Sequence, residues 1–469
     1  MTREAPLLEA LKAMKDTLPM HMPGHKRNRQ WGPVSSGFAG SNVYDLDFTE
    51  VPGLDDLHAP EGVIDRAQKL AGECFHSRHT LFLVNGASVG VTAAIMSCCA
   101  EGDTVLVPRH GHRCIYEGLV FSGAYPVYYQ PEFNSALTVP IGPNLGQIAS
   151  LIDSTHPKAL ILVHPTYHGM GCDLRIINEA ARNGVITIVD EAHGSHFCFD
   201  DRLPMSALEA GADVVVHSTH KTLGSMTQTG LLHLGTDRLD PGHLGNVLSL
   251  LQSTSPSYVL MASLDAMRAD LAEGGRETVG RTVDLALELR ERIGEIRGVF
   301  AADPGCSWGY DFTKIMLRSS FMDGFTLGQN LRREYGIYPE METHSFVLLM
   351  VTVGDTPYSI QRLLAALEDI SSKVSVEMPH NSPPVYNGLP EVVLTPRQAF
   401  YFPKQKCNLS ESIGKISGSL VVPYPPGVPL LCPGERISRE IVEYLDFIIV
   451  NRIHVHGLGR DCQLTVLEC

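Results

Sequence analysis

Short apolar runs alternate with longer amphipathic segments through the first half of the chain. The runs are often apolar at consecutive positions, which is typical of strands buried on both faces of a mostly parallel sheet. Seven strands are predicted in this way: Thr80–Val84, Thr104–Val107, Pro126–Tyr129, Ala159–Val163, Val185–Val189, Val214–His217 and Gly230–Leu234. Helical patterns are found at Glu61–Phe75, Val89–Cys99, Ile148–Ser154 and Arg175–Asn183. This alternation predicts α/β architecture with a mostly parallel central sheet.

The rest of the chain shows three further patterns. Residues 1 to about 60 look irregular and are dense in short motifs. Long helices are predicted from Gly245 to about Arg297, with an interruption at Ser253–Pro256. Mixed strands and helices follow at Ile315–Leu317, Leu327–Tyr335, Val347–Val353 and Ser359–Ser371, and Pro379–Pro384 has the composition of a linker. We therefore predict an amino-terminal arm (1–60), a large α/β domain (61–297), a small α+β domain (298–380) and a carboxyl-terminal module (381–469).

Composition and charge narrow the class of protein. A chain of 469 residues is too long for one ordinary hydrophobic core, so two or three domains are expected. The 44% hydrophobic and 19% charged content is ordinary for a soluble globular protein. The net charge of -15 argues against nucleic acid or an anionic membrane as the main partner. It mildly favours a small basic substrate.

Two features bear on where the protein works. The uncharged stretch from Thr80 to Ala100 is interrupted by the turn signal Asn85–Ser88, so it is interpreted as strand, turn and helix rather than a membrane span. The eleven cysteines are odd in number, contain no C-x-x-C pair and accompany no secretory signal. Reduced thiols in a cytoplasmic protein are therefore expected, not disulfides or a zinc framework.

A lysine follows the predicted strand Val214–His217, in the motif Ser218-Thr219-His220-Lys221. A lysine at a strand end can form an imine with an aldehyde cofactor, and the adjacent hydroxyls and imidazole can bind a phosphate. The alternative is a solvated lysine in a polar loop. This motif alone does not decide between the two.

A carboxylate follows the predicted strand Val185–Val189, in the motif D-E-A-H-G that begins at Asp190. Strand ends of α/β sheets are where ligands bind, and Asp190 there can keep a pyridine nitrogen protonated, which makes the ring an electron sink. One alternative is an aspartate that caps the next turn. A metal site formed by His193 and His196 near Asp190 and Glu191 is disfavoured, because nothing in the sequence marks the further ligands.

Two more strand ends carry candidate residues. Small residues at Asn85–Gly90 allow the backbone to approach a ligand, at a helix amino terminus that offers free N–H groups to an anion. His112, in the motif R-H-G-H-R-C, is able to stack on a flat cofactor. The alternative for the small residues is tight packing of the strand against the helix, and the alternative for the His112 motif is a basic surface patch. Because all four motifs follow strands, they can converge on one edge of the sheet.

In this order, the four motifs resemble those of the ornithine/lysine/arginine decarboxylases, within the aspartate-aminotransferase fold superfamily. The resemblance covers nearly the whole chain. It extends to H-M-P-G-H-K at 21–26, T-E-x-P-G-L-D-D-L-H at 49–58, S-T-S-P-S-Y at 253–258 and P-Y-P-P-G-V-P-L-L-C-P-G-E at 423–435. It implies a pyridoxal-phosphate-dependent transferase fold (fold type I), in which residues 61–297 bind pyridoxal 5'-phosphate.

The resemblance also implies roles for individual residues. Lys221 is similar to the Schiff-base lysine, Asp190 to the acid at the pyridine nitrogen, and His112 to the histidine that stacks on the ring. Cofactor contacts are further implied for Ala87, Ser88, His193, Ser218, His220 and Thr254. Of these, Thr254 falls in a segment that reaches the phosphate from the neighbouring subunit, so a homodimer with shared active sites is expected. Lys221 and His220 are both candidates to reprotonate the substrate carbon.

The chain departs from the family pattern in several places. Ala87 then Ser88 stand where many relatives have two hydroxyl residues, which puts one phosphate hydrogen bond in doubt. Arg113-Cys114 stands where longer relatives have Lys-Ser, and His193 replaces a tryptophan of the acid-inducible members. Because H-M-P-G-H-K already starts at His21, a receiver-like domain is not expected, and the chain resembles the short biosynthetic type.

The expected reaction is decarboxylation of a basic amino acid for polyamine synthesis. Arginine to agmatine is favoured by likeness to the short biosynthetic enzymes, and lysine or ornithine are the alternatives. An aminotransferase or carbon–carbon lyase would use the same Lys221 and Asp190, whereas a silent paralogue would be expected to have lost one of them. A basic substrate needs a carboxylate partner. Glu435, Asp47 and Glu50 are candidates, each with a purely structural role as the alternative.

Overall fold

We analysed a computed structural model of the chain. It describes residues 2–15, 17–23, 25–26, 43–134, 137, 139–374, 386, 388–424, 428–450, 453–459 and 461–468. The expected linker at Pro379–Pro384 and Gly24 of the H-M-P-G-H-K motif lie outside these residues.

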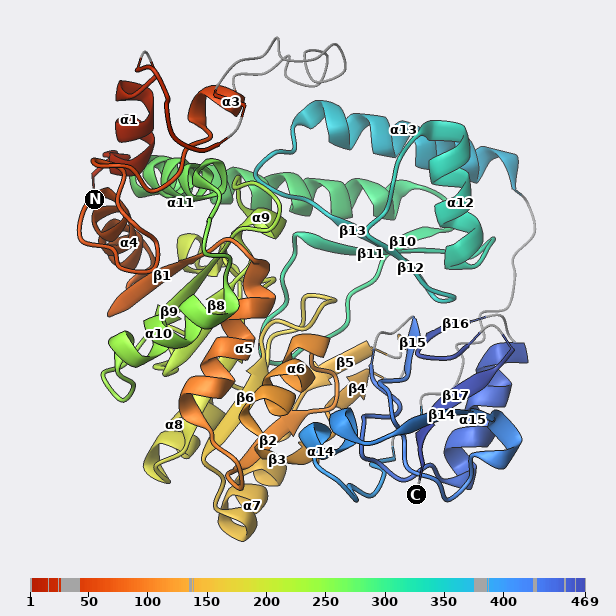
Figure 1. Cartoon of the computed structure of the whole chain (residues 1–469). Helices are drawn as coiled ribbons and strands as arrows, with labels where there is room; N and C mark the ends of the chain where they lie inside the picture. Colours follow the sequence, from red (N-terminus) through yellow and green to blue (C-terminus); the bar gives the residue numbers. More distant parts are fainter. Residues whose placement is uncertain are drawn as a thin grey trace.

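A seven-stranded sheet forms the centre of the large domain (Figure 1). Its strands, in spatial order, are β1 (His79–Leu83), β9 (Gly230–Leu234), β8 (Val214–His217), β7 (Ile186–Asp190), β6 (Ala159–Val163), β2 (Thr104–Pro108) and β3 (Tyr125–Tyr129). The five strands from β8 to β3 are parallel, and β9 runs antiparallel to both of its neighbours. The predicted α/β fold with a mostly parallel sheet is confirmed.

Helices cover both faces of this sheet, as expected where strands are apolar on both sides. One face packs against α5 (Gly86–Cys98), α6 (Arg113–Ser122) and α10 (Pro241–Leu251). The other face packs against α4 (Val63–Phe75), α7 (Leu145–Thr155), α8 (Arg175–Arg182) and the first part of α11 (Tyr258–Glu295). Alternate residues of a strand therefore enter different cores. Leu160 and Leu162 of β6 face α7 and α8, while Ile161 faces α5 and α6.

The parallel register brings the strand ends that carry the motifs to one edge. Val163 at the end of β6 pairs with Asp190 at the end of β7, and Asp190 pairs with Val216 of β8. The Lys221 motif follows β8 directly, and the His112 motif follows β2. The carboxyl ends of parallel strands are where an α/β sheet binds ligands.

The small domain is a second sheet that is covered by helices (Figure 1). Its strands lie in the order β10 (Val299–Ala301), β11 (Lys314–Ser319), β13 (Val347–Met350) and β12 (Met341–Glu342). Helices α12 (Gly324–Tyr335) and α13 (Pro357–Lys373) pack on it, together with the last turns of α11. Leu289 and Ile293 of α11 lie in this core, whereas Tyr258 and Met261 lie in a core of the large domain. The proposed domain boundary at residue 297 thus lies just after α11, a helix that contributes residues to the cores of both domains.

The carboxyl-terminal module has a hydrophobic core of its own. Its elements are α14 (Pro396–Tyr401), β14 (Lys404–Asn408), β15 (Val422–Tyr424), α15 (Arg439–Val450), β16 (His454–His456) and β17 (Gln463–Leu467). Among the described residues, the helices include none that is long and apolar enough to cross a membrane.

The expectation of an irregular amino-terminal arm is wrong in part. Helix α1 (Pro6–Ala13) and a short helix α3 (Val43–Leu46) lie within it. Ala5 at the start of α1 makes no side-chain cap, and the Asp265 carboxylate of α11 accepts the N–H of Leu7 (2.9 Å) instead. Helix α1 is therefore capped by a residue far along the chain, which local sequence patterns do not reveal. The hairpin of β4 (Glu132–Asn134) and β5 (Val139–Gly142) was also not predicted.

Candidate active site

A cavity of about 430 Å³ opens at the carboxyl ends of the parallel strands. Residues of all four sequence motifs line it. They are Ala87, Ser88, His112, Asp190, His193, Ser218, His220 and Lys221. Met341 of the small domain and Val428 of the carboxyl-terminal module also line the cavity, so the large domain, the small domain and the carboxyl-terminal module all contribute to it.

Lys221 lies in the single-turn helix α9 (Thr219–Thr222), directly after β8. Its Nζ is 2.9 Å from Nε2 of His193. Burial lowers the pKa of the Lys221 amine, and the negative charge of Asp190 opposes this lowering in part. A buried amine of lowered pKa in a cavity is suited to nucleophilic attack on a carbonyl carbon.

Asp190 is the last residue of β7 and is almost completely buried, with 7% of its surface exposed. Its Oδ1 accepts the N–H of Ala192 at 3.2 Å. The neighbouring Glu191 does not line the cavity, and its carboxylate accepts bonds from Ser206 and His217, each at 3.2 Å. His196 pairs with Asp311 at 3.4 Å. The four side chains considered for a metal site thus have different partners.

The amino terminus of α5 is suited to a phosphate. Asn85 at its start makes no side-chain cap, so the N–H groups of the first turn are not satisfied by it. Among the described residues, the hydroxyls of Ser88 and Ser218 have no hydrogen-bond partner. A Cβ at Gly230 would lie 2.6 Å from the His217 carbonyl oxygen and 3.4 Å from the Ala87 nitrogen. Glycine at this position therefore allows β9 to pack closely beside the turn.

Hydrogen bonds orient the two motif histidines. His112 is the N-cap residue of α6, and its Nδ1 accepts the N–H of Cys114 at 3.3 Å, so the ring proton is on Nε2. Burial lowers the pKa of His112, against the opposing charge of Asp190. His220 donates from Nδ1 to the carbonyl oxygen of Thr229 at 2.8 Å, which fixes the orientation of the ring.

Several residues at the site were not predicted from the sequence. Lys314 begins β11, is completely buried, and its Nζ lies 3.0 Å from Nδ1 of His193. His168 lines the cavity, and neither of its ring nitrogens has a hydrogen-bond partner among the described residues. Tyr167 lines the cavity as well, and its hydroxyl donates to Glu340. A lysine at the start of an otherwise apolar strand was the one available signal for Lys314.

The other predicted residues do not line this cavity. Thr254 is exposed in the loop between α10 and α11. Asp47 accepts a hydrogen bond from His25 Nε2 at 3.0 Å, and Glu50 accepts one from the hydroxyl of Thr49. Glu435 is buried and holds both terminal nitrogens of Arg109, at 2.5 and 2.8 Å. This pairing favours the structural alternative for Glu435 over substrate binding.

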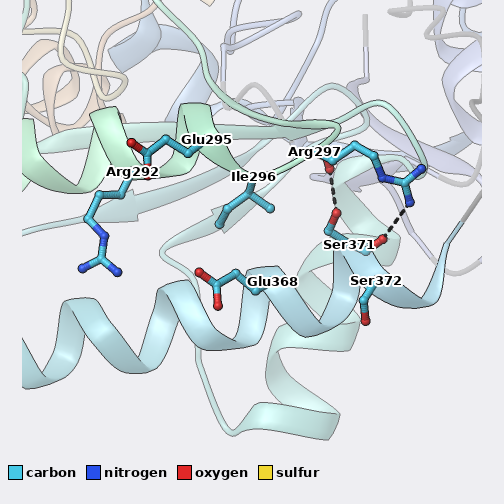
Figure 2. Close-up of a pocket in the computed structure, with 7 residues that line it drawn as sticks. All are labelled: Arg292, Glu295, Ile296, Arg297, Glu368, Ser371 and Ser372. Carbon is cyan, nitrogen blue, oxygen red and sulfur yellow. Dashed lines mark hydrogen bonds between the residues drawn. The ribbon is translucent and has the colours of Figure 1, made fainter.

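A second pocket, of about 400 Å³, lies between the end of α11 and α13 (Figure 2). Its lining residues are Arg292, Glu295, Ile296, Arg297, Glu368, Ser371 and Ser372. The Arg297 guanidinium is engaged by the carbonyl oxygens of Ser371 and Val374. None of the sequence motifs contributes to this pocket, so the first cavity is the candidate active site.

Solved structures identify the fold. Lysine decarboxylase A from Pseudomonas aeruginosa superimposes with a TM-score of 0.85 at 23% identity, over 99% of this chain and 80% of that one. The Francisella novicida lysine decarboxylase LdcF gives 0.84 at 20% identity, over 98% and 80%. An alanine–glyoxylate aminotransferase from Nostoc gives 0.54 at 17% identity, over 66% and 86%. The chain thus has the fold of these structures, which is fold type I.

Sequence comparison identifies the family. The family description "Orn/Lys/Arg decarboxylase, major domain" matches residues 5–306, and the corresponding carboxyl-terminal domain matches residues 380–465. The arginine decarboxylase of Bacillus subtilis is 37% identical over 94% of this chain and 93% of its own length. That of Halalkalibacterium halodurans is 34% identical over 92% and 90%. The lysine decarboxylase LdcA of Pseudomonas aeruginosa is 27% identical over 91% and 73%. The chain belongs to the ornithine/lysine/arginine decarboxylase family and is a decarboxylase, hence a lyase.

Proposed function

We propose that this protein binds pyridoxal 5'-phosphate in the cavity and decarboxylates arginine to agmatine. The observation that carries the proposal is the convergence of Lys221, Asp190 and the uncapped start of α5 on one cavity. Arginine is supported by the curated relatives that are 34–37% identical and named arginine decarboxylases. Lysine or ornithine is the alternative, and the more distant curated relatives include lysine decarboxylases.

The residues present fit this cofactor. The Lys221 amine would hold its aldehyde carbon, and Asp190 would keep the pyridine nitrogen protonated. The free hydroxyls of Ser88 and Ser218 and the first-turn N–H groups of α5 would hold its phosphate. When bound, pyridoxal phosphate supplies an electron sink for the electron pair of the carbon–carboxylate bond that breaks. His112 would stack on the ring, and His193 and His220 would line it.

Proton delivery to the substrate carbon is proposed for Lys221 or His220. Lys221 would be released when the substrate takes its place, and in the ammonium or imidazolium form a neighbouring amine or imidazole is a suitable general acid. The Nδ1 of His220 is engaged by the carbonyl oxygen of Thr229, so only its Nε2 is left to serve the substrate carbon.

The basic end of the substrate needs a carboxylate, and we propose Glu340 as its partner. Glu340 precedes Met341, which lines the cavity, and accepts a hydrogen bond from the lining residue Tyr167. It is exposed, and among the described residues it forms no ion pair. A guanidinium binds a carboxylate through paired hydrogen bonds, so a carboxylate that no ion pair occupies, next to a cavity-lining residue, suits arginine.

We further propose a cytoplasmic homodimer that serves polyamine synthesis. Thr254 is exposed and outside its own cavity, as a residue acting on the partner's phosphate would be. The ten cysteines in the described part of the chain are all unpaired, which is compatible with a reducing compartment.

One experiment tests the function and the lysine together. The purified protein is supplied with pyridoxal phosphate and then with arginine, lysine or ornithine, and the products are weighed by mass spectrometry. Loss of carbon dioxide, fastest from arginine, is expected. Borohydride reduction before substrate addition should leave the phosphopyridoxyl mass on the peptide that contains Lys221. A keto-acid product, or a label on a different lysine, would overturn the corresponding part of the proposal.

A further inference from the structure

Three side chains form a continuous hydrogen-bonded row that starts from two residues lining the cavity, Lys221 and His193. The Nζ of Lys221 lies 2.9 Å from Nε2 of His193, and Nδ1 of the same ring lies 3.0 Å from Nζ of Lys314. Lys221 and His193 belong to the large domain, whereas Lys314 begins β11 of the small domain. The row thus crosses from one domain to the other and ends on a lysine that the proposed chemistry does not use.

The Lys314 amine lies in an environment that is unusual for a cation. It is completely buried, and among the described residues the ion pairs include none to Lys314. The backbone is shaped around its stem: Gly169 has a φ of +91°, and a Cβ there would lie 2.9 Å from Cγ of Lys314. A buried ammonium without an ion pair is costly, so such groups are found mostly where they serve a function.

Charged and titratable groups face the row from both domains. Those acting on Lys221 or Lys314 are Asp190, Asp311, Glu340 and Cys114, and those acting on the ring between them include His112 and His168. Burial, reinforced by the charge of Lys221, lowers the pKa of Lys314 to about 8, so the two lysines compete for one positive charge. Burial, reinforced by the charges of the two lysines, holds the pKa of His193 well below its ordinary value. The imidazole is therefore neutral and carries one proton.

A neutral imidazole donates from one nitrogen and accepts at the other. If Nδ1 accepts from the ammonium of Lys314, the single ring proton must be on Nε2. Nε2 then donates to Nζ of Lys221, and Lys221 can accept only as the unprotonated amine. The row has room for one ammonium group, not two.

We propose that Lys314 is a positioning residue which, through His193, holds Lys221 as the free amine that attacks the cofactor aldehyde. In that step the Lys221 nitrogen forms a bond to the aldehyde carbon. The carbonyl oxygen leaves as water with the two amine protons, and no electrons are gained or lost. Lys314 forms no bond to the cofactor in this step and serves only as the donor to His193. Because Lys221 has this task only if the cofactor binds as proposed, the inference rests on the proposed function.

The test measures cofactor capture rather than turnover. Pyridoxal phosphate is added to cofactor-free enzyme, and the growth of the imine absorbance is timed by stopped flow across a range of pH. Wild type, Lys314→Met and Lys314→Arg are compared. On the acidic side the rate follows the fraction of Lys221 that is unprotonated. This acidic limb of the pH–rate profile should shift to higher pH by roughly one unit or more when the Lys314 charge is lost, since only one imidazole ring separates the two charges.

The expected result is thus capture about tenfold slower for Lys314→Met at a fixed pH on this limb, since one pKa unit is tenfold in the free amine. Lys314→Arg keeps the charge and the donor and should stay near the wild-type limb. A purely structural role would lower the rate of Lys314→Met at all pH values without moving the acidic limb of its pH–rate profile. That outcome overturns the proposal, and so does a Lys314→Met profile identical to that of the wild type.

Two further measurements separate the possible failures. Borohydride labelling of the wild type at Lys221 leaves the proposed function standing even if the limb does not move, whereas labelling at Lys314 contradicts the assignment of Lys221 itself. If Lys314→Met does not fold, the same profile is recorded for His193→Phe, which breaks the row at its centre. A limb displaced to higher pH supports the proposal, and an undisplaced limb overturns it.

Discussion

At the residue scale, the Asp190 carboxylate has the clearest expected contribution. Asp190→Ala should still capture the cofactor, because Lys221 remains, but the rate of carbon dioxide release should fall by on the order of a hundredfold or more. The physical reason is that the pyridine nitrogen would no longer be held protonated. Steady-state kcat, together with the visible absorbance of the bound cofactor, measures both effects.

Asp190→Asn serves as the matched control, since it keeps the shape and removes the charge. Both variants should be impaired if the charge is what matters. Turnover close to wild type in either variant would show that Asp190 has a structural task only.

Glu340 makes a second prediction at this scale. Glu340→Gln should raise the KM for arginine roughly tenfold or more, with a smaller change in kcat, because a charge-assisted hydrogen bond to the guanidinium is lost. Glu334→Gln removes another carboxylate of the small domain, one that pairs with Lys373, and should leave KM unchanged. Equal KM values for Glu340→Gln and wild type would show that the substrate's basic end binds elsewhere.

Whether the sequence predicts a site residue depends on which part of the chain supplies it. Lys221, Asp190, His112 and Ser88 all stand in the turns that follow predicted strands, so the rule that parallel strand ends meet was enough to group them. Lys314 and Glu340 reach the same place from the small domain. Their position depends on how two domains pack, and no local pattern records that packing.

At the scale of elements, the Arg109–Glu435 pair joins the loop after β2 to the carboxyl-terminal module. Arg109 also donates to the carbonyl oxygens of Pro429 and Leu430, next to the cavity-lining Val428. Glu435→Gln leaves a buried guanidinium without its counter-charge and should lower the free energy of unfolding by about 3 kcal/mol or more. Denaturant unfolding followed by circular dichroism measures this change.

The exposed pair of Arg436 and Glu391, at 2.7 Å, is the control. Glu391→Gln should cost less than about 1 kcal/mol, since exposed pairs contribute little. Unchanged stability of Glu435→Gln with a raised KM for arginine would instead restore the substrate-binding alternative for Glu435.

The elements themselves were predictable to different degrees. The seven strands of the central sheet were located within a residue or two, because an apolar run of four or five residues between turn residues is too short for a buried helix. Helix α1 was missed because its amino terminus is capped by Asp265, 258 positions from Leu7. Such a helix gains its stability from packing on α4 and α11, not from its own sequence.

At the scale of the whole molecule, the proposed dimer with shared sites makes a prediction for mixed subunits. One inactive protein carries Lys221→Ala, and the other has Thr254 and its neighbouring serines replaced by bulky residues. If Thr254 acts across the interface, a mixed dimer has one site with both lesions and one with neither. Subunit exchange should then restore up to roughly a quarter of wild-type activity for random pairing.

The exchange itself must be shown independently, for example by mass spectrometry of differently tagged subunits. Confirmed exchange without any return of activity would mean that each site is built within a single chain. The loop at Thr254 would then serve only to hold the amino-terminal segment, where His58 Nε2 bonds the carbonyl oxygen of Ser253 at 2.8 Å.

The buried contact between Arg109 and Glu435 also bears on the order in which the site is completed during synthesis, because the two residues are 326 positions apart. At typical rates of about 5–20 residues per second, a ribosome needs tens of seconds to travel that distance. All strands of the central sheet, with Lys221 and Asp190, have been made long before Glu435 emerges. Until then the Arg109 guanidinium lacks its counter-charge and the cavity lacks the wall at Val428. The proposed cofactor is therefore expected to be loaded only after the carboxyl-terminal module has been made and has packed against the cavity.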